Sequence, residues 1–552
     1  MPKNSYAPER EPDLQMDDIQ GIAVPGFFKP HQTLLCLRIP DDPEVLTGFR
    51  SYMSEFEVTS GTEALNDRVN HRKAAQRGLS SPPGPPRVLV AAALAYRLLQ
   101  RLAPDASAIR SVAFKQGLAA RSALLGDPQG VAHPGDPRNW IVGRADHELD
   151  AIIVVADDSR DAVDEVACDF EYALCALGVI VHVEKGDASP TKQAHEHFGF
   201  NDGISQPGIR GYADPDKPKF ITRRYVGKKF RPDTWLQGYP GQDLVWPGEF
   251  VFGYPAAGPD PLVPGPIATG GPTWMNNGSY LVFRRLRQDV VSFWTTMDNE
   301  ARRLSAVGGF GAITAERLAS LLIGRWPDGT PVQRSPGQPI PELGRSNLAN
   351  NNFRYGARTK DMYFEPLDVH PKAEPDPLGR TCPWASHIRK VNPRDAATDM
   401  GGAADTLSRR LLRVGVAYGP FLPESARLNR ADPASREDRG LLFMSIQSSI
   451  ENQFEFLHSK WMNDTTRPKT PGGHDMIVGQ NPTPGESRER HCLMFGKGSQ
   501  SSEVRAGADF VVPTGGGYFF VPSLRTLKKI MSTGKPARAA AAKKVPHRTA
   551  KR

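Results

Sequence analysis

Short runs of apolar residues, each followed by an amphipathic stretch, recur along the chain. Residues 151–156 form a run rich in β-branched side chains, which predicts a buried strand. Apolar side chains then return at helical spacing from Val163 to Leu177, so that one face of a helix is apolar. With a further strand expected over residues 179–183, this segment predicts a strand–helix–strand unit.

The same order of elements returns in the second half of the chain. Residues 280–283 and 441–446 predict strands, and each is followed by a segment with one apolar helical face. Two such halves predict an α+β fold, with the strands collected into sheets and the helices on their outer faces. Proline- and glycine-rich stretches at residues 238–272 and 328–344 are too long for plain connections. Loops of that length in an enzyme commonly build or cover a site.

The composition is that of a globular protein with several domain-sized units, since the 552 residues are 39% hydrophobic and 24% charged. Glycine (52) and proline (50) are both frequent, which favours long ordered loops over an all-helical bundle. No apolar run approaches the roughly 20 residues of a membrane span, and the polar N-terminus lacks the apolar part of a secretory signal. We therefore expect a cytoplasmic protein without a membrane span.

The net charge of +8 is concentrated at the C-terminus. Residues 535–552 contain seven basic side chains and no acidic one, so the rest of the chain is close to neutral. The body of the protein is therefore not expected to bind nucleic acid. The basic tail is expected to be disordered, either as a solvated extension or as a docking peptide, and the sequence leaves both readings open.

Several common motifs are absent. The five cysteines include no CxxC and no CxxCH, which argues against a zinc ribbon and excludes covalent c-type haem attachment. The chain also lacks the phosphate loop GxxxxGK[ST], the GxGxxG fingerprint, the GxSxG elbow and the HExxH helix. Nucleotide-dependent transfer, common serine hydrolysis and zincin proteolysis therefore lose support.

Three segments carry candidate chemistry. In HFGFNDGISQPGIRG, Asp202 stands between turn-forming residues that could hold a carboxylate near a ligand, or simply form an Asx-turn. In TCPWASHIRKVNPR, His387 lies among apolar and small residues with cations close by. That setting suits an axial ligand of haem iron, or a hydrogen-bonded core histidine. In SRRLLRVGVAYGPF, Arg413 lies in an apolar run, where it needs a carboxylate partner or a polar pocket.

Together and in this order, these segments resemble those of the dye-decolorizing peroxidase family. GFNDG matches the GxxDG motif of that family, CPWASHIRKVNPR is similar to its proximal-histidine segment, and LLRVGVAYGP is similar to its distal-arginine segment. Further similarity is present in DIQG, GRWPDGTP, GLLFMSIQSSIENQFEFL and GGGYFFVPSL, so the resemblance runs from about residue 18 to about residue 530. The length and the insertions resemble the larger, more elaborate branch of the family.

The resemblance implies a fold of two ferredoxin-like α+β modules, packed as in a dimeric α+β barrel and carrying long loops. It also implies one non-covalent haem b (iron protoporphyrin IX) per chain, bound in the C-terminal module. The expected division of the chain is a flexible lead at residues 1–20, an N-terminal module at 21–235, a haem-binding module at 236–534, and the basic tail at 535–552.

The resemblance also assigns roles, position by position. His387 would be the proximal iron ligand and Asp202 the distal acid–base residue. Arg413 would be the distal arginine, and Arg394 in the NPR triplet would contact a haem propionate. Phe443 would contribute to the apolar wall of the distal side.

The function implied is a haem peroxidase that uses H₂O₂ to oxidise bulky aromatic reductants, such as dyes and phenolics, through a ferryl intermediate. Such donors would be oxidised at the surface through Tyr or Trp relays, and a homo-oligomer is expected at the level of the family alone. A haem-binding or haem-handling protein with little turnover is the alternative, because it needs His387 but not the pair of Asp202 and Arg413. A third reading is an α+β protein without haem, in which the motif residues are structural.

Two positions depart from the family pattern. Ser449 stands where many relatives carry an aspartate that could hydrogen-bond to the proximal histidine. Glu451 and Glu455 lie nearby, and the sequence does not decide whether one of them, or neither, is the partner of the proximal histidine. Trp384 stands where a phenylalanine is expected, and its effect on packing or electron transfer is left open.

Overall fold

A computed structural model describes most of the chain between residues 11 and 532. Within this span the residues not described are 80, 83–86, 190–194, 214–219, 225–237, 261–262, 357–367, 400, 482–487 and 499. The expected domain boundary at residues 235 and 236 and the basic tail lie outside the described residues. The proposed domain limits therefore stay a prediction.

The N-terminal half contains a four-stranded antiparallel sheet. Its strands are β1 (His31–Arg38), β2 (Leu89–Leu94), β3 (Ala151–Asp157) and β4 (Ile180–Asp187). They lie in the order β2-β3-β1-β4, which is the order of a ferredoxin-like module. The helices α1 (Pro43–Ser54) and α6 (Arg160–Ala176) make the two crossovers of this module. The strand–helix–strand unit predicted around residues 151–183 is thus confirmed as β3, α6 and β4.

The C-terminal half repeats this arrangement. Its strands are β9 (Ser279–Gln288), β10 (Leu412–Arg413), β11 (Val416–Tyr418), β12 (Gly440–Gln447) and β15 (Val511–Val521). Both β10 and β11 pair with β12, and the order continues through β9 to β15. The crossovers contain α7 (Val290–Ala306) and a helical region over η9 (Ile450–Glu455) and η10 (Leu457–Met462). The predicted second helix is therefore present, but it is wound as a π-helix, a form that often occurs at functional sites.

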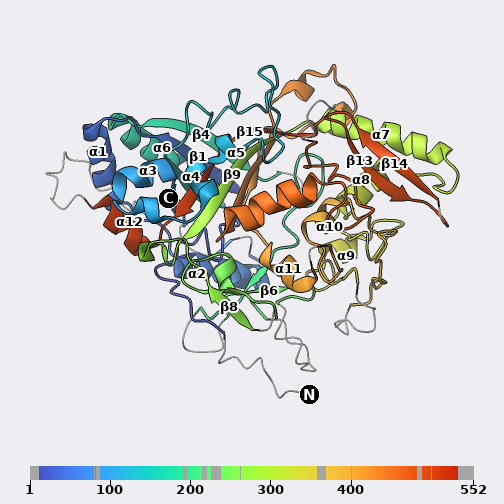
Figure 1. The fold of residues 1–552 in the computed structure, drawn as a ribbon, viewed down its shortest axis with the longest axis horizontal. Coiled ribbons are helices and arrows are strands. Elements are labelled where there is room, and N and C mark those ends of the chain that lie inside the picture. The colour runs from blue at the N-terminus through green and yellow to red at the C-terminus, as the bar shows by residue number, and fades with distance from the viewer. Residues whose placement is uncertain are drawn as a thin grey trace, which may run out of the picture.

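The two modules join at both edges of their sheets. On one side β15 pairs with β2 through Phe520 and Leu94. On the other side β4 lies against β11, and Gly186 leaves no room for a Cβ atom, which would come within 2.2 Å of Val416. The result is one continuous nine-stranded sheet whose end strands β4 and β11 approach each other as in a barrel, with helices outside (Figure 1). The α+β fold with two ferredoxin-like modules is confirmed.

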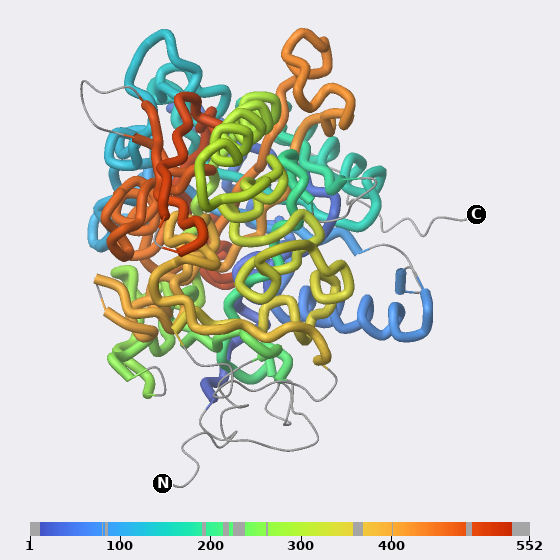
Figure 2. Tube along the Cα trace, turned by 90° about the vertical axis from the view of Figure 1, so that its right-hand side faces the viewer, coloured from blue at the N-terminus to red at the C-terminus, as the bar shows by residue number. Residues whose placement is uncertain are grey.

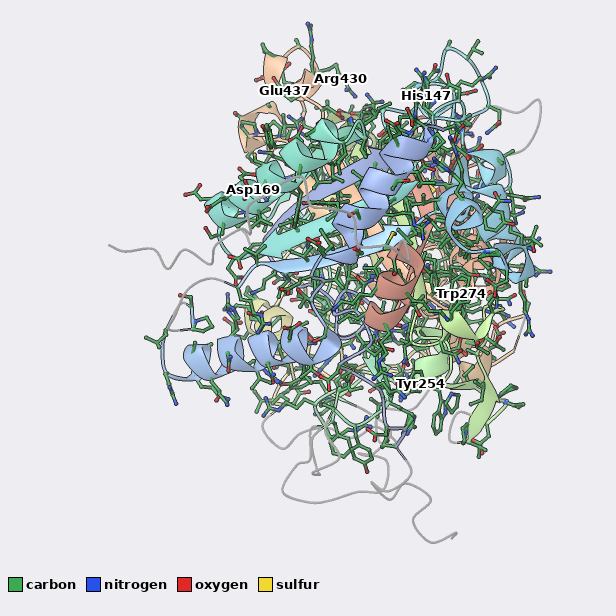
Figure 3. The ribbon with its side chains drawn as sticks, turned by 90° about the vertical axis from the view of Figure 1, so that its left-hand side faces the viewer. His147, Asp169, Tyr254, Trp274, Arg430 and Glu437 are labelled. Atoms are coloured by element: carbon green, nitrogen blue, oxygen red, sulfur yellow. The ribbon has the colours of Figure 1, made fainter. Side chains whose placement is uncertain are left out.

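The strands β1, β2 and β3 are buried on both faces, which explains why they form continuous apolar runs, whereas β4 is partly exposed. In β3, Ile153 and Val155 belong to the core beneath the helices, whereas Ile152 and Val154 belong to the core inside the barrel. Figure 3 shows the side of the molecule on which helices cover the first sheet, with Asp169 of α6 at the periphery. Two apolar layers therefore support the same sheet from opposite faces.

The remaining helices and strands lie mainly in the insertions and connections. They are α2 (Gly61–Gln76), α3 (Tyr96–Leu102), α4 (Val112–Gln116), α5 (Leu118–Arg121), β5 (Gly208–Ile209), β6 (Leu244–Val245), β7 (Pro255–Ala257), β8 (Pro264–Ile267), α8 (Ala315–Ile323), α9 (Pro341–Arg345), α10 (His387–Val391), α11 (Ala403–Ser408), β13 (Arg490–Phe495), β14 (Ser501–Ala506) and α12 (Leu524–Met531). Figures 1 and 2 show α8, α9 and α10 gathered beside the C-terminal module. No helix in the described part of the chain is long and apolar enough to cross a membrane.

Candidate active site

A cavity beside β9 and β12 brings together the residues that the sequence singled out. The cavity is partly open to solvent, and its empty space, with the open part included, is about 1650 Å³. Its walls come from the loop after β4, from β9 and β12, from α10, and from η9 and η10. All five predicted site residues line it: Asp202, His387, Arg394, Arg413 and Phe443. Chain segments that are distant in sequence therefore meet at one cavity.

His387 is the first residue of the short helix α10. Its ring nitrogen Nδ1 lies 2.7 Å from Oδ2 of Asp475, to which it donates a hydrogen bond. Nε2 has no hydrogen-bond partner among the described residues. Burial lowers the pKa of His387, but the charge and hydrogen bond of Asp475 outweigh burial and raise that pKa above its ordinary value. The imidazole is thus fixed in one orientation with one nitrogen available for a ligand.

Asp475 is fully buried and firmly seated. Its Oδ1 accepts hydrogen bonds from the backbone N–H groups of Ile477 at 2.9 Å and Val478 at 3.1 Å. Burial raises the pKa of Asp475, but His387 and these two N–H groups hold that pKa at about 2. The carboxylate is therefore ionised and keeps the proton of the shared hydrogen bond on His387.

Neither glutamate considered from the sequence is the partner of His387. Glu451 accepts hydrogen bonds from the hydroxyl of Ser111 and the backbone N–H of Ala113, both at 2.8 Å. Glu455 forms a two-pronged ion pair with Arg121, at 2.5 and 2.6 Å. Ser449 stands where many relatives carry an aspartate. Its side chain caps η9 by accepting a hydrogen bond from the backbone N–H of Asn452.

Asp202 and Arg413 form an ion pair at the cavity, with 2.9 Å between Oδ1 and Nη1. Burial raises the pKa of Asp202, but the charge of Arg413 and a hydrogen bond from the N–H of Gly203 leave it below its ordinary value. The carboxylate is therefore ionised at neutral pH. Arg413 was expected to need a carboxylate partner or a polar pocket, and Asp202 of the first segment is that carboxylate.

Arg413 is held by the loop that carries Asp202. The side-chain amide of Gln206 donates to the carbonyl of Arg413 at 2.9 Å and accepts from its N–H at 3.2 Å. The Nη2 group of Arg413 donates to the carbonyl of Ser205 at 3.1 Å. Because Arg413 lies on the short edge strand β10, these bonds fix its position beyond what pairing with β12 provides.

Five further arginines line the cavity and could meet acidic groups of a ligand: Arg284, Arg325, Arg394, Arg409 and Arg410. The guanidinium of Arg394 already donates to the carbonyl of Phe353 at 2.8 Å and to the side chain of Asn351 at 2.5 Å.

The buried Nη1 atom of Arg410 has no hydrogen-bond partner in the described part of the chain, and the same is true of Nε of Arg409 and of Nε and Nη1 of Arg284. Asp243 is 3.8 Å away, and burial lowers the pKa of Arg410 to about 10. Sequence analysis missed Arg410, although it lies in the same segment as Arg413.

The apolar part of the cavity comes from β12 and the helices that face it. Leu441 and Phe443 of β12 line it together with Phe454 and Leu457. The rings of Phe443 and Phe454 lie 6.2 Å apart. The prediction that Phe443 contributes to an apolar wall of this cavity agrees with its position, whereas its role toward a bound group stays a prediction.

Trp384 does not line the cavity in the described structure. Its ring lies 4.0 Å from the guanidinium carbon of Arg389, and the ring of Tyr355 lies 4.3 Å from the same atom. Arg389 is fully buried between the two rings and pairs with Asp376 at 2.9 Å. Trp384, which stands where a phenylalanine was expected, therefore contributes to the packing around α10.

Comparison with known proteins agrees with the fold. No protein-family model matches the chain. A dye-decolorizing peroxidase of Mycena epipterygia is 30% identical over 410 residues, which cover 71% of this chain and 68% of the relative. The multifunctional dye peroxidase DyP2 of an Amycolatopsis species is 30% identical over 402 residues, which cover 70% of this chain and 72% of the relative. An ancestral D-type dye-decolorizing peroxidase of known structure aligns with a TM-score of 0.72 and 29% identity, over 94% of this chain and all of that one.

The similarity to dye-decolorizing peroxidases over most of the chain, on a double ferredoxin-like fold, identifies the protein as a haem peroxidase. The chain belongs to the dye-decolorizing peroxidase family.

Proposed function

We propose that this protein uses H₂O₂ to oxidise bulky aromatic donors such as dyes and phenolics, with His387 as the proximal ligand of one non-covalent haem b. The observation that carries the proposal is the meeting of His387 with the Asp202–Arg413 ion pair at one cavity. The cytoplasmic location, the homo-oligomer and the docking role of the basic tail stay predictions.

The residues of the cavity fit a haem group. The walls combine apolar side chains from β12, η9 and η10 with a few convergent polar groups, which is the usual character of a cofactor site. Nε2 of His387 is available to iron. Arg394 would hold the propionates through charge-assisted hydrogen bonds, together with the Nη1 atom of Arg410, which has no hydrogen-bond partner among the described residues.

Bound haem would supply the iron at which peroxide is reduced and which then takes electrons from the donor to return to its resting state. The ionised Asp202 would take a proton from hydrogen peroxide and return it to the departing oxygen, which leaves as water. General acid–base catalysis of this kind typically contributes about 10²–10⁴ in rate. Arg413 would place a fixed positive charge where negative charge develops as the O–O bond breaks.

Asp475 would orient His387 and increase its strength as a ligand. A carboxylate that accepts the Nδ1 proton fixes the tautomer and makes Nε2 the more basic nitrogen. Two backbone N–H groups hold the carboxylate of Asp475 in place. Asp475 would therefore determine the orientation of the His387 ring.

The proposal is tested with the holoprotein and three variants. H387A should lose tight haem binding, seen as loss of the Soret band after gel filtration. D202N and R413L should keep the Soret band and slow dye oxidation by H₂O₂. A Soret band that survives H387A would contradict the ligand assignment. A parent protein that binds haem but oxidises no donor would favour the haem-handling alternative.

A further inference from the structure

One carboxylate of the cavity has no part in the chemistry described above. Glu196 lies six residues before Asp202 and lines the same cavity. Its Oε2 accepts hydrogen bonds from the backbone N–H of Phe198 at 2.7 Å and from the side-chain amide of Gln288 at 2.6 Å. Its Oε1 accepts from the backbone N–H of Phe200 at 2.9 Å. Both oxygens are therefore bound by donors of the protein.

The hydrogen bonds of the Glu196 carboxylate stabilise a tight turn over residues 196–200. The backbone N–H of Glu196 donates to the carbonyl of Phe200 at 3.0 Å, and the N–H of Gly199 donates to the carbonyl of Glu196 at 2.9 Å. Gly199 has a φ of +96°, a conformation in which other residues are strained. The carboxylate of Glu196 binds two N–H groups inside this turn, which would otherwise lack partners there.

The turn is fastened to the junction of β9 and α7. Gln288 is the last residue of β9. The ring of Phe198 stacks on Phe293 at 4.4 Å, and the ring of Phe200 stacks on Trp294 at 6.2 Å, both on α7. Glu196 thus connects a rigid strand end to the loop that continues directly into Asp202.

The two carboxylates of this loop influence each other. Burial raises the pKa of Glu196 to about 7 against the effect of its three donors, and the negative charge of Asp202 adds to this increase. An electrostatic effect of Asp202 on Glu196 agrees with their placement at the same cavity.

We propose that Glu196 is a positioning residue, which fixes the turn that presents Asp202 to the cavity and affects peroxide only through Asp202. This inference rests on the proposed role of Asp202. In E196Q, the new amide would turn an N–H group toward the N–H of Phe198 or that of Phe200, so one bond of the turn is lost. In E196D, the carboxylate is kept but its side chain is one methylene too short.

The test measures how fast cyanide binds to the ferric holoprotein, followed by the Soret shift. Hydrogen cyanide must give up a proton to bind as the anion, so its association rate reports whether a distal base is in place. We expect E196Q and E196D each to slow association about 10- to 100-fold, since a small misplacement of a reacting group has effects of this size. The double variant E196Q/D202N should be no slower than D202N.

A matched control is E249Q. Glu249 is buried, accepts a backbone hydrogen bond from Ala257 at 2.8 Å, and burial raises its pKa to about 7, but it does not line the cavity. E249Q should therefore bind cyanide at the parent rate.

The outcomes separate the inference from the proposed function. Parent-like rates in both E196Q and E196D would overturn the positioning role. So would multiplicative slowing in the double variant, because Glu196 would then act independently of Asp202. If D202N itself bound cyanide at the parent rate, the proposed role of Asp202 as distal base would be wrong, and the inference about Glu196 would lose its basis.

Discussion

The Nδ1 atom of His387 lies 2.7 Å from Oδ2 of Asp475, a residue 88 positions further along the chain. The carboxylate is fully buried and ionised, and its other oxygen is bound by backbone N–H groups. Through this contact, a loop between η10 and β13 sets the orientation of a side chain on α10.

Removal of the Asp475 charge should weaken haem binding. We expect D475N to lower haem affinity or peroxidase activity about 10- to 100-fold, because the amide no longer strengthens His387 as a ligand. Haem affinity is measured by transfer of haem to apomyoglobin. E451Q, which changes the carboxylate that binds Ser111 and Ala113, should leave haem affinity unchanged. Equal haem loss in both variants would speak against the specific role of Asp475.

Loss of the Asp202 carboxylate should slow the reaction with peroxide but spare haem binding. We expect D202N to reduce the rate of reaction with H₂O₂ about 10²- to 10⁴-fold in stopped-flow measurements, since no base then accepts the peroxide proton. D169N is a control for charge, because Asp169 is exposed on the outer side of α6 (Figure 3). A rate in D202N equal to that in D169N would remove Asp202 from the mechanism.

Arg413 should control the pH at which Asp202 becomes protonated. Its charge lowers the pKa of Asp202, so the carboxylate stays ionised, and the reaction with peroxide stays fast, to a lower pH than for an ordinary aspartate. In R413L the pKa of Asp202 rises, and the acid limb of the pH–rate profile should move to higher pH. The readout is the midpoint of that limb, which is independent of any change in maximal rate. An unmoved midpoint would show that the limb belongs to another group.

The junction of the two modules depends on a buried arginine. Arg285 of β9 pairs with Glu184 of β4 at 2.8 Å, with Asp438 at 2.7 Å, and donates to the hydroxyl of Tyr418 at 3.0 Å. R285M leaves Glu184 buried without this cation and should lower the free energy of unfolding by about 3–5 kcal/mol in urea. R302M breaks the exposed pair of Arg302 with Asp298 and should cost no more than about 0.5 kcal/mol. Equal effects would mean that the Arg285 network contributes little to the junction.

Local periodicity predicted part of the barrel, but not its strands β10, β11 and β15. The run at residues 151–156 and the helical spacing from Val163 to Leu177 correspond to β3 and α6, because both are buried against the core in the way their patterns require. The pairing of β15 with β2 and the approach of β4 to β11 could not be predicted from periodicity, since the contacts join strands from different modules.

The candidate site was predictable only in part. Asp202, His387 and Arg413 lie in distinctive segments, and the structure places them at one cavity. Asp475 was missed because its contact with His387 arises from tertiary packing. The GGHD segment that contains it offers an aspartate in a glycine-rich loop as the only local signal. The glutamates nearer to Ser449 have other partners, which no local pattern reveals.

The most direct test of the account is the visible absorption spectrum of the purified protein before and after one equivalent of H₂O₂. The account predicts a Soret band that changes rapidly on addition of peroxide in the parent protein and slowly in D202N. A Soret band that peroxide leaves unchanged in the parent would contradict the peroxidase function and favour haem handling. A protein without a Soret band after haem reconstitution would show that His387 does not hold haem.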